Sequence, residues 1–395
     1  MNQVVLKKGR AKPALHKHPW IFSGAIGRIV GDPADGDVVE VRDAGGNFLA
    51  HGLLNRRSQI VVRLLNWERD RVPDAAFWRH RMERALAGRA APAADPVTNA
   101  YRLVHAEADG LPGLIVDRYG DYLVVQFLIL GMERRKEEIA SLLIELAAPR
   151  GIWERSDAPV RAKEGLPPAV GLLHGTPPPD HLEVLENGHR FLVDLAGGQK
   201  TGLYLDQRAN RQRVSAYCAG KMALDAFCYS GGFSVYAATA GAGPLTLLDS
   251  SAGALALAAE NLRLNGRDIG GDEFLTADAF QQLRRFRAEG RTFDTIILDP
   301  PKFAHSQADI PRAARGYKDI NLLAMQLLRS GGVLATFSCS GLVSADLFQK
   351  IVFGAAIDAG RDVQILERLS QGTDHPILLT FPESEYLKGL ICRVW

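Results

Sequence analysis

The sequence is poor in cysteine and carries no excess of charge of one sign. Its four cysteines, at positions 218, 228, 339 and 392, are too far apart for a disulfide framework or for paired metal ligands. We therefore predict no metal site and a reducing, cytoplasmic environment. Lys and Arg outnumber Asp and Glu by only 47 to 45. A nucleic-acid partner would therefore have to be recognised by a local cluster of basic residues.

Long apolar runs are also missing. The first twenty residues, "MNQVVLKKGRAKPALHKHPW", place no apolar run behind their positive charges. No later segment approaches the roughly 20 uninterrupted apolar residues that cross a bilayer, so we predict no association with membranes. With 395 residues, 47% of them hydrophobic, the chain is long enough for two or three domains with buried cores.

Basic residues gather near the amino terminus. Lys7, Lys8, Arg10 and three further basic residues precede the first acidic residue, Asp32, and Trp20 lies among them. Basic side chains beside an aromatic ring suit phosphate contacts next to a stacking platform. We predict that Lys7, Lys8, Arg10 and Trp20 bind substrate; the alternative is a solvated basic edge of the protein.

The pattern of residues changes twice along the chain. Residues 1–72 show short alternating runs with Gly and Asp turns, which predict a small antiparallel barrel. Residues 73–190 begin with an amphipathic helix whose apolar side includes Ala76, Met82, Ala85 and Leu86. Strand, strand, helix and strand follow, then a Pro-rich passage and a hairpin that turns at Asn187-Gly188. Residues 191–395 alternate strands and helices, which predicts a parallel sheet.

The stretch "KMALDAFCYSGGFSVYAATAGAG" reads as a strand ending at Asp225, a glycine loop and a helix. The next strand ends at Asp249, where a carboxylate can bind ribose hydroxyls, and "FLTADAF" offers Asp278 for adenine. The loop lacks the first glycines of G-x-G-x-x-G, which argues against a pyrophosphate and favours S-adenosylmethionine. The predicted cofactor residues are Asp225, Phe227, Tyr229, Ser230, Gly231, Asp249, Ser250, Asp278, Ala279 and Asp299.

The fourth strand, "FDTIILDPPKF", ends in an acid and two prolines. Asp299, Pro300, Pro301, Lys302 and Phe303 then lie just past the carboxyl edge of the sheet, where α/β proteins bind ligands. The rigid prolines suit a loop that borders a substrate pocket, and the motif matches a base-binding loop of nucleic-acid methyltransferases. An ordinary strand-ending turn is the alternative. Phe303 either stacks on the bound base or anchors the loop to the core.

The fifth strand, "GGVLATFSCSG", places Cys339 at the same edge, among polar or small neighbours. Methylation of a pyrimidine at C5 needs a thiolate to add at C6, because C5 is otherwise a poor nucleophile. We predict that Cys339 is this nucleophile and that Asp299 binds the base edge and favours the adduct. Cys228, in the cofactor loop, is predicted to be a packing residue.

Several longer motifs together resemble the RlmI type of 23S ribosomal RNA (cytosine-5)-methyltransferase. They are "HPWIFSGAI", "DGLPGLIVDRYGDYLVVQ", "GGQKTGLYLDQRANR", "DAFCYSGGFSVYAA", "LDPPKF", "FSCSG" and "DHPILLTFPESEYLKGLICRVW". The resemblance implies a PUA-like RNA-binding barrel, a small central α/β domain, a Rossmann-like methyltransferase domain with a final antiparallel strand, 23S ribosomal RNA as substrate, and a homodimer. It also implies that "KTGLYLDQR" borders the cofactor through Lys200, Thr201, Asp206 and Arg208. Read without the resemblance, the same stretch is a capped helix start.

One departure from related enzymes leaves alternatives open. Other cytosine-5 RNA methyltransferases place a cysteine directly after the proline of the fourth-strand motif, where this chain has Pro301 and Lys302. "DPPK" is also close to the motif of uracil-5 enzymes, so only the resemblance selects cytosine. A methyltransferase for uracil or another RNA base and a catalytically silent RNA-binding assembly factor remain the alternatives. A nicotinamide dehydrogenase fits least, because the phosphate-loop glycines are missing.

Overall fold

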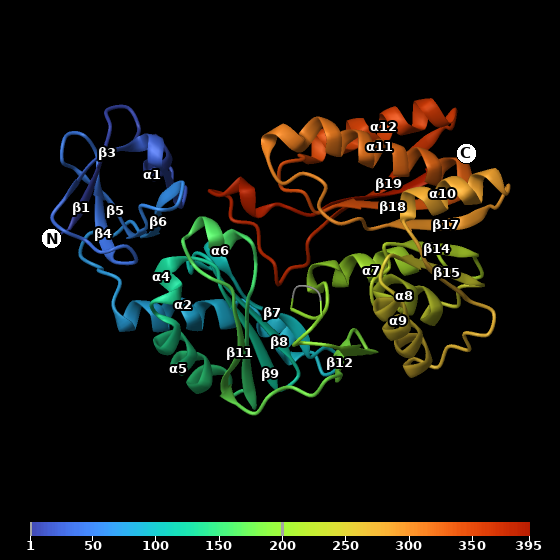
Figure 1. Cartoon of the computed structure of the whole chain (residues 1–395), viewed down its shortest axis with the longest axis horizontal. Helices are drawn as coiled ribbons and strands as arrows, with labels where there is room; N and C mark the ends of the chain where they lie inside the picture. The colour runs from blue at the N-terminus through green and yellow to red at the C-terminus, as the bar shows by residue number, and fades with distance from the viewer. Residues whose placement is uncertain (1, 199–200) are drawn as a thin grey trace. The chain divides into compact units, whose positions relative to one another are not determined.

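The computed structural model describes residues 2–198 and 201–395, so Lys200 lies outside the described residues. The chain forms two compact units (Figure 1). The first contains the described residues of Met1–Leu185, Val193–Leu203 and Asp374–Ser384, and the second contains Glu186–Leu192, Tyr204–Thr373 and Glu385–Trp395. In the described part of the chain, no helix has the length and apolarity needed to cross a membrane.

The first unit opens with a six-stranded sheet in the order β2-β6-β5-β4-β1-β3. Its elements are β1 (Gln3–Leu6), α1 (Lys12–Leu15), β2 (Trp20–Phe22), η1 (Ser23–Ala25), β3 (Ile26–Val30), β4 (Val38–Arg42), β5 (Phe48–Leu54) and β6 (Ile60–Asn66). Inward-facing aliphatic residues such as Val4, Val41 and Val62 form its core. The predicted antiparallel pairing is wrong for one pair, since β1 and β4 run parallel. Strands β2 and β3 come between β1 and β4 in the chain, and they return it to the end of the sheet at which β1 begins.

A five-stranded sheet follows in the order β11-β10-β9-β8-β7. Its elements are α2 (Ala75–Ala87), α3 (Ala90–Ala94), β7 (Ala100–His105), η2 (Ala106–Asp109), β8 (Leu114–Tyr119), β9 (Tyr122–Phe127), α4 (Leu130–Glu133), α5 (Lys136–Ala147), β10 (Gly151–Ser156), α6 (Val160–Lys163) and β11 (Ala169–Gly175). The strand-strand-helix-strand prediction is confirmed, but β11 was hidden in the Pro-rich passage. Ala76 is exposed, contrary to the prediction, because α2 buries the face that carries the aromatic rings of Phe77 and Trp78 instead.

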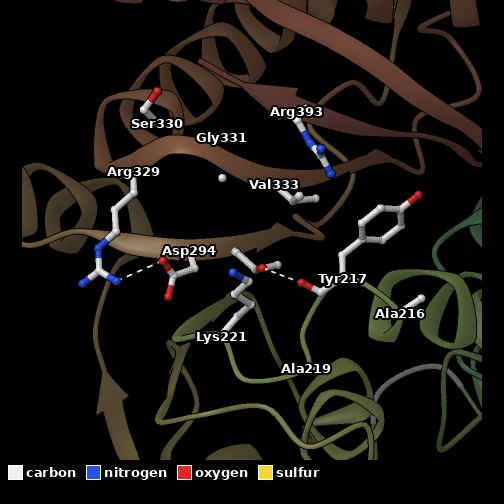
Figure 2. A pocket seen from close by; sticks show the side chains of 12 residues that line it. Ala216, Tyr217, Ala219, Lys221, Asp294, Arg329, Ser330, Gly331, Val333 and Arg393 are labelled. Carbon is white, nitrogen blue, oxygen red and sulfur yellow. Dashed lines mark hydrogen bonds and ion pairs between the residues drawn. The ribbon is translucent and has the colours of Figure 1, made fainter.

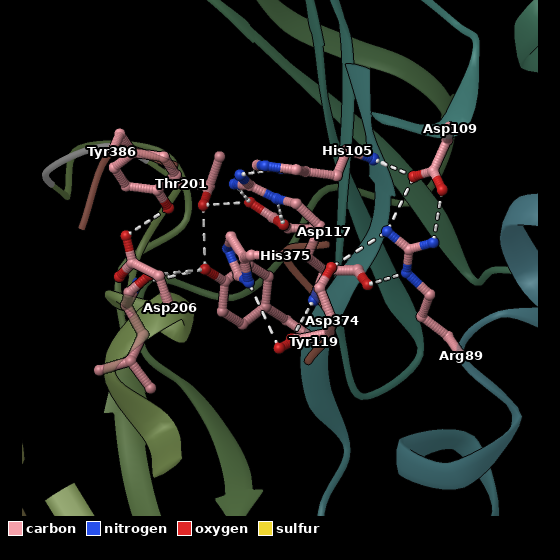
Figure 3. Close-up of polar contacts among 12 residues, drawn as sticks. Arg89, His105, Asp109, Asp117, Tyr119, Thr201, Asp206, Asp374, His375 and Tyr386 are labelled. Atoms are coloured by element: carbon pink, nitrogen blue, oxygen red, sulfur yellow. Dashed lines mark hydrogen bonds and ion pairs between the residues drawn. The ribbon is translucent and has the colours of Figure 1, made fainter. Parts of the chain in front are cut away.

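A buried polar network crosses the first unit (Figure 3). Arg102 donates to both carboxylate oxygens of Asp117, at 2.7 and 2.8 Å, and Thr201 Oγ1 donates to Asp117 Oδ2 at 2.7 Å. Arg89 Nη2 donates to the carbonyl of Asp374 at 3.0 Å, and Asp374 Oδ2 accepts from the Arg102 amide at 2.9 Å. Charged groups buried together in this way need partners, and here they tie Asp374 of the segment Asp374–Ser384 to β7.

Two short strands, β12 (Leu182–Glu186) and β13 (His189–Val193), form the predicted hairpin. Its turn residues Asn187 and Gly188 have φ of 50° and 82°. A two-residue turn with both φ values positive matches the twist of the strands on either side, and Asn-Gly is the pair that adopts it most readily.

The second unit contains a seven-stranded sheet in the order β16-β15-β14-β17-β18-β20-β19. The strands are β14 (Ala223–Ala226), β15 (Leu245–Asp249), β16 (Glu273–Thr276), β17 (Phe293–Leu298), β18 (Leu328–Ser338), β19 (Val363–Ser370) and β20 (Lys388–Val394). The helices are η3 (Leu205–Gln207), α7 (Arg208–Ser215), α8 (Gly232–Thr239), α9 (Ala252–Leu264), α10 (Ala279–Ala288), η4 (Gln307–Asp309), α11 (Ile310–Leu327), α12 (Ala345–Ala359) and η5 (Pro382–Ser384), the last of which belongs to the first unit. Helices α7 to α9 cover one face of the sheet and α10 to α12 the other (Figure 1).

The strand order places the carboxyl ends of five parallel strands, β16, β15, β14, β17 and β18, at one edge of the sheet. Strand β14 pairs in parallel with both β15 and β17, and the chain builds the sheet first to one side and then to the other. Ligands bind α/β sheets at such a switch point, outside the carboxyl ends of the strands. Strand β20 is antiparallel to β18 and β19, as the resemblance implies. The predicted Rossmann-like fold is confirmed, and the three-domain division stays a prediction.

Candidate active site

The loop after β14 has an unusual backbone. Phe227, Tyr229 and Gly231 have φ of 64°, 47° and 77°, a left-handed conformation that costs energy for residues with a side chain. Only glycine fits at position 231, because an added Cβ would lie 2.9 Å from the Cβ of Ala258 in α9. Ser230 is buried in the same loop, and its carbonyl accepts from Asn261 Nδ2 at 3.0 Å. Strained backbone that is held in this way is typical of ligand-binding sites.

Asp249, the last residue of β15, braces this loop. Its Oδ2 accepts from the Tyr229 amide and its Oδ1 from the Ser251 amide, both at 2.9 Å. Each carboxylate oxygen has two lone pairs, so the group can accept further hydrogen bonds. The next residue, Ser250, is exposed. Asp249 therefore has the position and the free lone pairs that ribose hydroxyls require.

Asp225 is almost fully buried in β14. Burial raises the pKa of its carboxyl to about 7; Asp299 and Asp249 raise it further, and the hydrogen bond from Ser234 Oγ at 2.7 Å opposes them. Its Oδ1 is buried with no hydrogen-bond partner among the described residues. An orphaned buried oxygen at the carboxyl edge fits a site that a polar ligand completes.

We expect the substitution Asp225→Asn to remove a pH dependence of stability. The folded pKa lies above the unfolded value of 3.8, so ionising this group costs stability as the pH rises from about 4 through 7. A shift of this size corresponds to roughly 4 kcal/mol at most. The urea midpoint of the wild type should fall relative to that of the variant between pH 4 and pH 8. Parallel pH profiles of the two proteins would contradict the assignment.

The residues after β17 lie beside this carboxylate cluster. Asp299 is half-buried, and its amide donates to the carbonyl of Ala226 in β14 at 3.4 Å. Pro300 is buried, whereas Pro301 and Lys302 are exposed. Phe303 packs on Tyr317 with a ring separation of 4.6 Å and joins the core beneath α11. The structure therefore favours the core anchor over the base-stacking role for Phe303.

Cys339 follows β18 and differs from the other cysteines. It is half-buried, and its Sγ lies 3.9 Å from the carbonyl oxygen of Pro300. The other three are buried, and burial raises the pKa of Cys218 and of Cys392 to about 12 and that of Cys228 well above its usual value. Buried neutral thiols are poor nucleophiles. Of the four cysteines, Cys339 is therefore the one whose surroundings are compatible with a nucleophilic role.

Two residues of this edge were missed in the sequence. The ring of Tyr204 stands at right angles to that of Tyr229, 5.6 Å away. Burial raises the pKa of Tyr204, and electrostatic interactions with Asp299, Tyr229 and Cys339 raise it further. Tyr204 therefore lies close to these three groups. Lys388 opens β20, is buried, and pairs in register with Ser338, the residue before Cys339. Lys388 carries no local signal, because only the long-range pairing of β20 with β18 brings it here, whereas Tyr204 lies within the "KTGLYLDQR" stretch.

The "KTGLYLDQR" residues divide between the two units. Thr201, in the first unit, is buried and bonded to Asp117 and Tyr119. In the second unit, Asp206 Oδ2 accepts from the Tyr386 hydroxyl at 2.7 Å, and Arg208 begins α7 and is buried. Elsewhere on the second unit, Asp278 is the exposed cap of α10 and accepts from the Gln281 amide at 2.9 Å, and Ala279 is buried.

The basic residues of the first unit lie at its surface. Lys7, Lys8 and Arg10 are exposed, and Lys7 Nζ donates to the carbonyl of Gly24 at 3.2 Å. Trp20 is half-buried; its Nε1 donates to Glu107 at 2.8 Å, and its ring meets that of Phe381 edge-on at 4.6 Å. Lys7, Lys8 and Arg10 are thus available to a polyanion, whereas much of Trp20 is engaged inside the unit.

Two further observations concern metal binding and a second hollow in the structure. Among the described residues, no group of His, Cys, Asp or Glu could hold a metal ion. A hollow of about 370 Å³ lies where β17 and β18 begin, lined by residues that include Lys221, Asp294, Arg329 and Arg393 (Figure 2). Because α/β ligand crevices form at the carboxyl ends of strands, this hollow at the opposite edge is separate from the candidate site.

Comparison with known proteins agrees with this reading of the fold. A family model described as S-adenosylmethionine-dependent methyltransferase matches residues 160–382, and a PUA-like domain model matches residues 4–67. A protein of Shewanella amazonensis is 49% identical over 100% of this chain and 99% of its own length. One of Aeromonas salmonicida is 49% identical over 99% of this chain and 98% of its own. Both are named ribosomal RNA large subunit methyltransferase I.

Solved structures show the same fold. A Streptococcus mutans protein described as a candidate SAM-dependent methyltransferase is 22% identical, with a TM-score of 0.86 and full coverage of both chains. A further methyltransferase candidate, solved in complex with SAH, is also 22% identical and fully covered, with a TM-score of 0.88. At this identity the likeness extends to the fold alone.

Proposed function

Because the chain belongs to the S-adenosylmethionine-dependent methyltransferase family whose relatives are named ribosomal RNA large subunit methyltransferase I, we propose that it methylates C5 of a cytosine in 23S ribosomal RNA through a covalent cysteine adduct. The observation that carries the proposal is the position of Cys339. It is half-buried at the carboxyl edge of the sheet, with its Sγ 3.9 Å from the Pro300 carbonyl of the "DPPKF" loop.

The residues around β14 and β15 suit the cofactor. S-adenosylmethionine supplies an electrophilic methyl group on a sulfonium. Asp249 would accept from the ribose hydroxyls, and the strained loop 227–231 would bring the backbone close to the ligand. The orphaned Oδ1 of Asp225 would gain a partner in the bound state. Asp278 remains the proposed residue for the adenine, Ser250 and Ala279 remain proposed cofactor residues, and Thr201, Asp206 and Arg208 remain proposed residues of the surrounding wall.

The chemistry assigned to Cys339 starts with a bond between its sulfur and C6 of the base. The electron pair of the C5–C6 double bond then becomes available at C5, which takes up the methyl group. Loss of the C5 proton and departure of the thiolate restore the ring, so the cysteine is regenerated. Asp299, at the end of β17, would hydrogen-bond the base edge and stabilise the adduct.

The base must leave its stack to reach this edge. Flipping exposes the ring of a nucleotide to a pocket at a modest cost, lowest for a base that is already single-stranded. The exposed Pro301 and Lys302 would contact the flipped nucleotide beside Asp299. Lys7, Lys8 and Arg10 would contribute phosphate contacts that position the RNA, and Trp20 remains the proposed stacking platform beside them. The resemblance also supports our proposals of a homodimer and of a cytoplasmic location. Measurement of the molecular mass in solution tests the homodimer.

The test is transfer of labelled methyl from S-adenosylmethionine to unmodified 23S ribosomal RNA, followed by identification of the labelled nucleoside. We expect the label in 5-methylcytidine. Label in 5-methyluridine or in an exocyclic amine would replace cytosine C5 with one of the alternatives. Binding of RNA without cofactor binding or methyl transfer would point to the silent assembly factor.

A further inference from the structure

A buried lysine binds the segment that carries the cysteine of the proposed mechanism. Lys388 is 5% exposed, and its Nζ donates to the carbonyl oxygens of Ser340, at 2.8 Å, and Val343, at 2.6 Å. In the sheet, Lys388 lies opposite Ser338. The lysine therefore reaches along the segment that carries Cys339 and holds its backbone on the carboxyl-terminal side of the thiol.

This arrangement is costly unless a negative charge is formed nearby. Within the described part of the chain, the ammonium group forms no ion pair with a carboxylate, and it donates to the two neutral carbonyls. Burial of a cation that has no ion-pair partner is unfavourable. A neutral residue could donate the same hydrogen bonds at a lower cost in desolvation free energy. The two hydrogen bonds to backbone carbonyls therefore do not explain why a charged residue occupies this position.

We propose that the ammonium group of Lys388 is the counter-charge of the Cys339 thiolate and that it fixes the segment 339–343, which makes Lys388 a positioning residue for the nucleophile. The inference rests on the role proposed for Cys339. An adjacent cation favours the thiolate over the thiol, and the thiolate is the form that adds to C6. When the thiolate becomes a thioether in the adduct, the two carbonyls keep the ammonium group solvated.

The charged groups around Lys388 agree with this role. Burial lowers the pKa of Lys388 to about 8; Cys339 and Glu385 oppose the lowering, and Lys302 adds to it. The folded pKa lies below the usual 10.5, so the lysine keeps its charge at neutral pH and loses it as the pH rises through about 8. The benefit to the thiolate should therefore be confined to pH values below that range.

The experiment measures alkylation of Cys339 by iodoacetamide against pH, in the full chain and without RNA, with the modified cysteine identified by peptide mass spectrometry. Lys388→Gln keeps hydrogen-bond donors for the two carbonyls but removes the charge. We expect alkylation at pH 7 about tenfold slower than in the wild type, with the pH of half-maximal rate shifted upward and the two rates converging above pH 9. Lys388→Arg, which keeps the charge, should alkylate at the wild-type rate at pH 7.

The control is Lys350→Gln, an exposed lysine of α12 that should leave the profile unchanged. If Lys388→Gln is folded and its profile coincides with that of the wild type, the inference is overturned. If that variant unfolds, Lys388→Arg decides, because a folded Arg variant that alkylates about tenfold more slowly than the wild type at pH 7 would contradict a role of the charge. Alkylation needs neither substrate, so methyl transfer that survives Cys339→Ala would remove the proposed nucleophile while leaving the Lys388 result readable.

Discussion

Substitution of Cys339 by alanine is expected to lower the rate of methyl transfer to ribosomal RNA on the order of 10⁴-fold or more, with little change in the affinity for S-adenosylmethionine. Without the sulfur no bond to C6 can form, and C5 stays too electron-poor to take up the methyl group. The proposed cofactor site lies at the ends of β14 and β15, which do not contain this residue. Single-turnover methyl transfer and calorimetric binding of the cofactor measure the two effects separately.

The matched control is Cys218→Ala. Cys218 is buried in the turn that follows α7, where its Sγ lies 3.5 Å from the carbonyl of Val214, and its substitution should affect stability only. Cys339→Ser separates size from reactivity, since it keeps the volume and loses most of the nucleophilicity. A Cys339→Ala protein that methylates C5 at the wild-type rate would rule out the covalent scheme.

The second large effect concerns Asp249. We expect Asp249→Ala to weaken binding of S-adenosylmethionine about 100-fold, because two charge-assisted hydrogen bonds to ribose hydroxyls, together worth about 3 kcal/mol, are lost. The same change frees the amides of Tyr229 and Ser251 and loosens the strained loop. Isothermal titration of the cofactor into the RNA-free protein gives the dissociation constant.

Two further variants show whether the loss is specific. Asp249→Asn keeps one acceptor without the charge and should weaken binding less than the alanine variant. Asp346→Ala removes an exposed carboxylate of α12 and should leave the affinity unchanged. If Asp249→Ala binds the cofactor as the wild type does, the ribose contact is wrong and the carboxylate serves the loop alone.

Much of the second unit could be predicted because its signals are local. Apolar runs ending in Asp225, Asp249 and Asp299 fix parallel strands, and a parallel sheet gathers their carboxyl ends at one edge. The position of Cys339 follows from the same rule. The strained φ values at Phe227 and Tyr229 could not be predicted, because left-handed backbone is rare for such residues and is imposed here by tertiary contacts.

What the sequence could not provide depends on long-range pairing and burial. Lys388 reads as an ordinary charged residue at a strand start, and only its antiparallel alignment with Ser338 places it behind the thiol. Phe303 could stack on a base or pack in the core, and the position of Tyr317 favours the core. Strand β11 was hidden because prolines flank it on both sides, at positions 168 and 177.

The most direct test of the account uses a 23S ribosomal RNA fragment in which 5-fluorocytidine replaces cytidine. Fluorine at C5 blocks the proton loss that would release the enzyme, so a scheme through a cysteine adduct halts with protein and RNA joined. Incubation with S-adenosylmethionine, nuclease digestion and peptide mass spectrometry should find a methylated fluorocytidine bonded to the peptide that contains Cys339. Recovery of the adduct on another residue, or turnover of the fluorinated RNA with no adduct, would contradict Cys339 as the nucleophile.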